Sequence, residues 1–166
     1  MSDLGHAQSF RDLVVYQKAR AIAKDVFKMT KGFPAEKRFS LTDQVRRSSR
    51  SVGAQIAEGW AKRRYDKHFV SKLTDSDGEQ QETQHWIETA HDCEYITKQQ
   101  MDALLGSLSE VGRMLQSMIC KADLFCETKE TMLRESEPEY FVSSDQQMPT
   151  ENGSLITDNC HEHSIL

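Results

Sequence analysis

The chain has 166 residues and a mass of 19.0 kDa, which is enough for one domain with a core of its own. Only 37% of the residues are hydrophobic and the mean hydropathy is -0.65, so part of the chain is expected to lie outside that core. No apolar run approaches the roughly 20 residues that span a bilayer, and the first ten residues lack the basic and apolar segments of a signal peptide. We therefore expect a cytoplasmic protein that does not bind membranes, with its four cysteines as reduced thiols.

The net charge of -5 conceals a segregation of charge along the chain. Residues 11–72 contain sixteen Lys and Arg against six Asp and Glu, whereas residues 73–110 contain one against nine. Residues 127–166 contain two against nine, a net charge of -7, and have no sustained apolar period. We expect a folded domain over residues 11–126, between a flexible N-terminus at 1–10 and a disordered acidic C-terminal tail at 127–166.

The first two predicted helices lie in the basic segment. The first runs from about Asp12 to Lys31 and ends before a Gly-Phe-Pro sequence. The second begins after Ser40, the expected N-cap, with Asp43 three residues later as in a capping box, and fades after Gly59. The inward positions at helical spacing are Val15, Ala19, Ile22, Val26 and Met29 in the first helix, and Leu41, Val45, Ser48, Val52, Ile56 and Gly59 in the second.

The third predicted helix, from a cap at Asp66 to about Tyr95, has a mixed inner face. Three polar residues, Ser76, Gln80 and Thr83, lie in the middle of that face. A polar group buried without a partner costs about 1–3 kcal/mol, so these residues either form an internal hydrogen-bonded network or face water. Of the two, we expect contact with water. The other positions of this face are Phe69, Leu73, Ile87 and Ala90.

The fourth predicted helix follows a second capping box, Thr97 with Gln100, and has a long apolar stripe. No segment of the chain alternates at period two, as a half-buried strand would. Four amphipathic helices joined by short connections predict an all-α fold, an antiparallel up-and-down four-helix bundle. The fourth stripe consists of Met101, Leu104, Leu105, Leu108, Val111, Leu115, Met118, Ile119 and Phe125.

The basic side chains of the first two helices are predicted to lie outside the bundle. Those of the first helix form a stripe opposite its core, while Arg46 and Arg50 lie together on the outer side of the second, with Arg47 on a neighbouring outer face. Clustered Lys and Arg bind nucleic-acid phosphates with little sequence preference, although they can equally be an ordinary solvated surface. The predicted nucleic-acid-binding residues are Arg20, Lys24, Lys28, Lys31, Arg46, Arg47, Arg50, Lys62, Arg63, Arg64 and Lys67.

The second helix also contains many small residues, which would allow other helices to approach it closely. A basic face from the first two helices and an acidic face from the third can meet head to tail between copies, and such contacts close into rings. The same charges could instead pair within one bundle.

Four motifs carry a family resemblance: "LVVYQKA" at 13–19, "FP" at 33–34, "LTDQVRRSSRSVGAQIAEG" at 41–59, and Phe69. They resemble the bacterial four-helix bundle proteins over about residues 10–122. This family includes the proteins encoded in intervening sequences of 23S rRNA genes and the accessory variability proteins of diversity-generating retroelements. The chain departs from the pattern at Gly53, where the family often has Pro, and at Gln55, where it usually has Asn.

The resemblance implies a non-enzymatic bundle that assembles as a ring, typically a pentamer. In the retroelement members, the basic surface of the ring binds nucleic acid and a reverse transcriptase. The acidic tail is an addition to the family pattern, and its charge of -7 could screen the basic surface or compete for it.

Two Glu-x-x-His pairs on the third helix suggest a di-metal enzyme, but their spacing argues against it. Di-iron bundles need such motifs facing inward from two different helices. Glu82 with His85 and Glu88 with His91 lie six residues apart on one helix, a rotation of about 240°, so they cannot face one centre. The cluster "CHEH" at 160–163 lies in the tail, without the fixed scaffold of a structural zinc site. We expect no metal, no cofactor and no catalysis.

The sequence thus predicts a homo-oligomeric bundle that binds RNA or DNA through its first two helices. Such a protein would act as an accessory to a reverse transcriptase or as an rRNA-associated protein. The alternative is a protein-interaction or scaffold module, in which the same basic faces bind an acidic partner or a neighbouring subunit.

Overall fold

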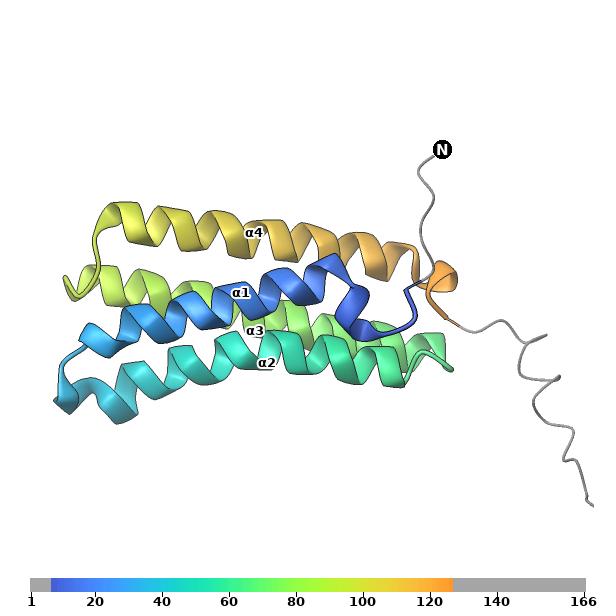
Figure 1. Ribbon diagram of the computed structural model, residues 1–166, viewed down its shortest axis with the longest axis horizontal. Coiled ribbons are helices and arrows are strands. Elements are labelled where there is room, and N and C mark those ends of the chain that lie inside the picture. The colour runs from blue at the N-terminus through green and yellow to red at the C-terminus, as the bar shows by residue number, and fades with distance from the viewer. Residues whose placement is uncertain (1–6, 127–166) are drawn as a thin grey trace, which may run out of the picture.

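The computed structural model describes residues 7–126 and shows four long helices packed side by side (Figure 1). They are α1 (Val14–Met29), α2 (Asp43–Ala61), α3 (Asp66–Asp92) and α4 (Lys98–Cys120). Short 3-10 or π-helical turns occupy Phe10–Asp12, Thr30–Gly32, Ala35–Lys37, Arg38–Thr42 and Ala122–Leu124. The predicted up-and-down four-helix bundle is confirmed. Residues 1–6 and the predicted tail at 127–166 lie outside the described residues.

The core is formed by the predicted inner faces of the four helices. Every predicted inward position of α2 and α3 is buried, as are those of α1 except the half-buried Met29. In the predicted stripe of α4, Leu108, Val111, Leu115 and Met118 are buried, and the remaining members pack partly buried against them. α1 packs on α2 and α4, and α3 packs on the other sides of the same two helices.

The three polar residues of the inner face of α3 are buried, so the expected contact with water is wrong. Ser76 Oγ donates a hydrogen bond to the Val52 carbonyl at 2.9 Å. Thr83 Oγ1 lies 2.9 Å from Ser48 Oγ, and the Gln80 amide donates to a carboxylate one turn earlier. The other alternative therefore holds: all three side chains are hydrogen-bonded inside the bundle, and those of Ser76 and Thr83 connect α3 to α2.

The starts of α2 and α3 differ from their predictions. The backbone is already helical in the π turn at Arg38–Thr42, so Ser40 is not the N-cap of α2. Asp66 is the first residue of α3 rather than its cap, and its carboxylate accepts a hydrogen bond from the next backbone N–H at 2.8 Å. At α4, the predicted capping box is confirmed, because Thr97 and Gln100 each accept a bond from the other's backbone.

Small residues let α2 approach both of its neighbours. A Cβ atom built on Gly59 would lie 3.2 Å from the Cβ of Lys72, which is tighter than an ordinary contact, so α3 packs against the backbone of α2 here. On the side that faces α1, a Cβ on Gly53 would lie 3.6 Å from the ring of Tyr16. α2 is therefore packed closely between two helices.

A half-buried carboxylate lies where α2 and α3 meet. The side chain of Glu79 is 20% exposed, and its Oε2 is buried without a hydrogen-bond partner among the described residues. Its nearest cation, Nη1 of Arg47, lies 3.9 Å from Oε1. Burial, and then repulsion from Glu82, raise the pKa of Glu79, while Arg47 opposes the shift. The charged form of Glu79 therefore opposes folding.

The internal hydroxyl network can be tested by replacing Thr83 with Val. Thr83→Val keeps the side-chain shape but leaves Ser48 without its partner across the α2–α3 contact, so we expect a loss of about 1 kcal/mol in the free energy of unfolding. Thr74→Val is the matched control, because Thr74 bonds the carbonyl one turn earlier, as Thr83 does, but is exposed. Urea denaturation followed by circular dichroism measures both. Equal losses in the two variants would contradict a stabilising contact between the helices.

Glu79→Gln should stabilise the bundle in a pH-dependent way. The folded chain holds the Glu79 proton to a higher pH than the unfolded chain, so this carboxyl favours folding at low pH, and its contribution is lost as the pH rises through the folded pKa. The variant should therefore match the wild type at low pH and gain stability relative to it as the pH rises through the titration of the carboxyl. Urea denaturation at several pH values measures the difference. Glu88→Gln, on the exposed side of α3, is the control, and a difference that does not vary with pH would contradict the assignment.

Candidate nucleic-acid interface

α1 and α2 form a shallow groove of about 320 Å³ on the outside of the bundle. Most side chains that line the groove are small, because the residues that let the two helices approach each other also line the space between their outer faces. Each helix contributes one arginine to the lining, and neither contributes a carboxylate. The groove is lined by Tyr16, Ala19, Arg20, Ala23, Ser49, Arg50, Gly53, Ala54 and Ala57.

The two arginines of the groove, Arg20 and Arg50, have no partner of opposite charge among residues 7–126. Both are exposed, and neither makes an ion pair or a side-chain hydrogen bond with any residue that the structure describes. Lys24, one turn further along α1, is exposed and unpaired within the same part of the chain. Positive charge at this groove is therefore not cancelled locally, and the groove suits an anionic ligand.

An exposed aromatic ring extends the groove toward the end of α1. Phe27 follows Ala23 of the groove by one turn, and 48% of its surface is exposed. Arg46 Cζ lies 4.8 Å and Lys31 Nζ 5.1 Å from the centre of the ring. Arg46 is also held by a bond from its Nε to the Thr30 hydroxyl at 2.7 Å. Sequence analysis predicted the two cations but missed Phe27, which its spacing of four residues before Lys31 would have placed beside the basic stripe.

Three of the predicted cations are neutralised by carboxylates instead. Arg47 faces α3, where its Nη2 lies 2.7 Å from Oε1 of Glu82. Lys62 Nζ lies 2.6 Å from Oε1 of Glu58, and Lys28 is paired with Asp25 at 3.2 Å. The predicted basic residues therefore do not form one continuous surface.

Lys62 also affects the ionisation of its partner. Its hydrogen bond, followed by that of Lys72, lowers the pKa of Glu58. The same carboxylate and Asp75 raise the pKa of Lys72. These charges stabilise one another along the α2–α3 contact, which makes this side of α2 unsuitable for a polyanion.

The remaining predicted cations lie at the connection between α2 and α3. Arg63 Cζ lies 4.3 Å from the centre of the Trp60 ring, and its Nη1 donates to the Trp60 carbonyl at 2.9 Å. Arg64 and Lys67 are exposed beside it. This basic connection is at the end of the bundle where α1 begins (Figure 1), so it lies near the Tyr16 end of the groove.

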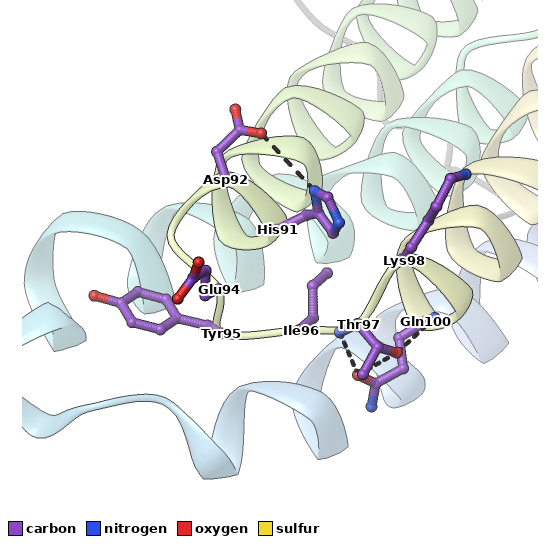
Figure 2. A pocket seen from close by; sticks show the side chains of 8 residues that line it. All are labelled: His91, Asp92, Glu94, Tyr95, Ile96, Thr97, Lys98 and Gln100. Atoms are coloured by element: carbon purple, nitrogen blue, oxygen red, sulfur yellow. Dashed lines mark hydrogen bonds and ion pairs between the residues drawn. The ribbon is translucent and has the colours of Figure 1, made fainter.

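A second cavity, of about 470 Å³, lies at the turn between α3 and α4 (Figure 2). It contains none of the predicted basic residues. Nδ1 of His91 lies 3.8 Å from Asp92, and the reciprocal bonds of the α4 capping box form another part of its wall. The lining combines one lysine with two carboxylates, so it lacks the unbalanced positive charge of the α1/α2 groove.

Neither a metal cluster nor a membrane span is found in the part of the chain that the structure describes. No three His, Cys, Asp or Glu side chains between residues 7 and 126 come together as a metal site. None of the helices there is both long and apolar enough to cross a bilayer. The "CHEH" cluster at 160–163 lies outside the described residues.

Comparison with known proteins gives the family. The model of the 23S rRNA-intervening sequence protein family matches residues 11–117. A crystal structure of a protein of unknown function from the S23 ribosomal protein family of Bacteroides thetaiotaomicron is 30% identical, with a TM-score of 0.59, over 64% of this chain and 95% of that one. No curated protein gives a significant match. Because the family model spans well over half of the sequence, the chain belongs to the 23S rRNA-intervening sequence protein family.

Proposed function

We propose that this protein is a non-enzymatic, homo-oligomeric bundle that binds RNA or DNA through the α1/α2 groove. One observation carries the proposal: Arg20 and Arg50, from two different helices, line one groove without a carboxylate in its wall. Neither arginine is paired within residues 7–126. Elsewhere on α2, Glu82 of α3 neutralises Arg47 and Glu58 neutralises Lys62, so the unpaired charge is a local property of this groove.

Phosphate groups fit this arrangement better than other anions of similar charge. A guanidinium group binds two phosphate oxygens at once through its planar set of donors. Ala23, Gly53 and Ala54 leave room for a phosphate backbone to approach the helices. Binding of this kind releases condensed counterions and so weakens as salt rises.

Phe27 favours a single-stranded ligand over a duplex. An exposed ring beside a basic groove can stack on an unpaired base, and such stacking depends little on sequence. Bases inside a duplex do not present their faces in this way. We therefore infer that single-stranded segments bind more tightly than duplex DNA of the same length.

Self-assembly would repeat this groove around a ring. The α1/α2 groove and the acidic helix α3 lie on different sides of α2, which suits head-to-tail contacts between copies. Several weak grooves that bind one strand together have a higher combined affinity than a single groove. A pentamer, the typical ring implied by the family resemblance, would supply five of them.

A protein ligand is the second candidate, and the apolar exposure of α1 favours it. Val14 is 55% exposed and Phe27 is 48% exposed. An acidic, amphipathic partner helix could contact Phe27 and the arginines of the groove together. Lack of nucleic-acid binding at low salt would favour this alternative.

Charge reversal in the groove tests the nucleic-acid proposal. Arg20→Glu with Arg50→Glu should weaken binding at least tenfold at low salt and reduce the salt slope by about 1.4–2, because two phosphate contacts are lost. Fluorescence anisotropy with labelled single-stranded RNA and duplex DNA over a salt series measures both quantities.

The control reverses the same number of charges on α4, with Lys98→Glu and Arg113→Glu. These side chains are exposed and lie outside the groove, so binding should weaken far less although the net charge changes equally. Circular dichroism checks that helicity is retained. Equal weakening by the two pairs would mean that net charge, rather than the groove, determines binding.

Self-assembly is tested by the mass of the full chain in solution. We expect light scattering after size exclusion to give a multiple of the 19.0 kDa chain mass, five times that mass for a pentamer. The measurement should be repeated at high salt, because contacts between basic and acidic faces weaken there. A single-chain mass at low salt and high protein concentration would contradict the ring.

A further inference from the structure

We propose that residues 127–166 dock on the α1/α2 groove of their own chain and mask it. The docking is a property of the chain alone. Its consequence, competition with RNA or DNA, rests on the proposed function.

The segment and the α1/α2 groove carry opposite charge. The segment contains nine acidic residues against two basic ones, and five of the nine lie within residues 127–139. The groove offers Arg20 and Arg50, unpaired among the described residues, and no carboxylate that would repel an acidic chain. A polyanionic peptide and a nucleic-acid strand present the same kind of charge to this groove.

The other faces of the bundle attract an acidic segment less, because they are either acidic themselves or carry cations that are already paired. Residues 73–110, which form most of α3 and the first half of α4, contain nine acids against one base. On the other side of α2, Arg47 and Lys62 are already paired with carboxylates. The groove, with Arg20 and Arg50, is a cationic area that is left unpaired among residues 7–126.

The described chain ends near the basic α2–α3 connection. Phe125 stacks on Phe69 in the first turn of α3, with ring centres 6.0 Å apart. The 3-10 turn Ala122–Leu124 lies at the end of the bundle where α1 begins and α2 ends (Figure 1). The described chain therefore ends, at Cys126, close to the basic connection, from which the groove runs along α1 and α2.

The segment is also long enough. Its forty residues span at most about 130 Å when extended, whereas the whole of α1 is about 24 Å long. A tethered ligand of this kind acts at an effective concentration of about a millimolar. Weak contacts between carboxylates and the groove are therefore sufficient to occupy it when no competitor is present.

Docking can be measured without any nucleic acid. A carbodiimide that couples carboxylates to amines should join acids of residues 127–166 to Lys24 and Lys31 in the full chain, as mapped by mass spectrometry. These cross-links should be lost at high salt and should not depend on protein concentration. Lys98, which lies at the same end of the bundle as Lys31 but on α4 and outside the groove, reports non-specific coupling. Coupling to Lys98 as frequent as coupling to Lys24 would overturn the docking.

The consequence is measured with full-length variants, so that the chain is never shortened. One variant replaces the nine acids of residues 127–166 by Gln or Asn, and the other rearranges the order of the segment while keeping its composition. We expect the neutral variant to bind single-stranded RNA about tenfold more tightly than the wild type at low salt. The rearranged variant should bind like the wild type, because the attraction depends on charge rather than on order.

The two proposals fail in different ways. Cross-links to Lys24 without RNA binding by any variant would leave the docking standing and remove the nucleic-acid function. Equal RNA binding by the wild type and the neutral variant, with no cross-links to Lys24 or Lys31, would overturn the docking and leave the function standing. Tighter binding by the rearranged variant than by the wild type would also overturn docking through charge alone.

Discussion

The close packing of α2 between α1 and α3 is the constraint on which the rest of the structure depends. Gly59 lets α3 contact the backbone of α2, and on the other side the ring of Tyr16 on α1 packs over the small Gly53, where a Cβ atom would be in ordinary contact. Small side chains at these contacts leave little apolar area to bury, so hydroxyl bonds supplement the packing. The same small residues continue onto the outer face of α2, where they line the groove instead of filling it.

The helix positions that face inward could be read from the sequence, whereas the partners of polar groups could not. The spacing of apolar residues along a helix identifies the face that points into the core, and every predicted inward residue of α3 is buried. It does not show what lies opposite that face. Ser76 and Thr83 were expected to meet water because their partners, a carbonyl and a hydroxyl of α2, lie 24 and 35 residues away in sequence. Only the fold brings these groups together.

The same limit applies to the candidate site. The helical wheel placed Arg46, Arg47 and Arg50 outside the core, and all three are at least partly exposed. It could not show that Arg47 faces the acids of α3 while Arg50 faces α1. Neighbouring outward positions on α2 therefore have opposite electrostatic environments, and the difference depends on the helix packed beside each one.

The order of the helices explains why positive charge remains unpaired in a chain that has an excess of acids. In this bundle, α1 packs on α2 and α4. The most acidic helix, α3, packs on the far side of α2. Carboxylates of α3 can thus neutralise Arg47, but the body of α2 separates them from the α1/α2 groove. Folding alone does not bring an acid to Arg20 and Arg50. Any carboxylate or phosphate that reaches them must come from outside the four helices: from the end of the chain, from another copy, or from a ligand.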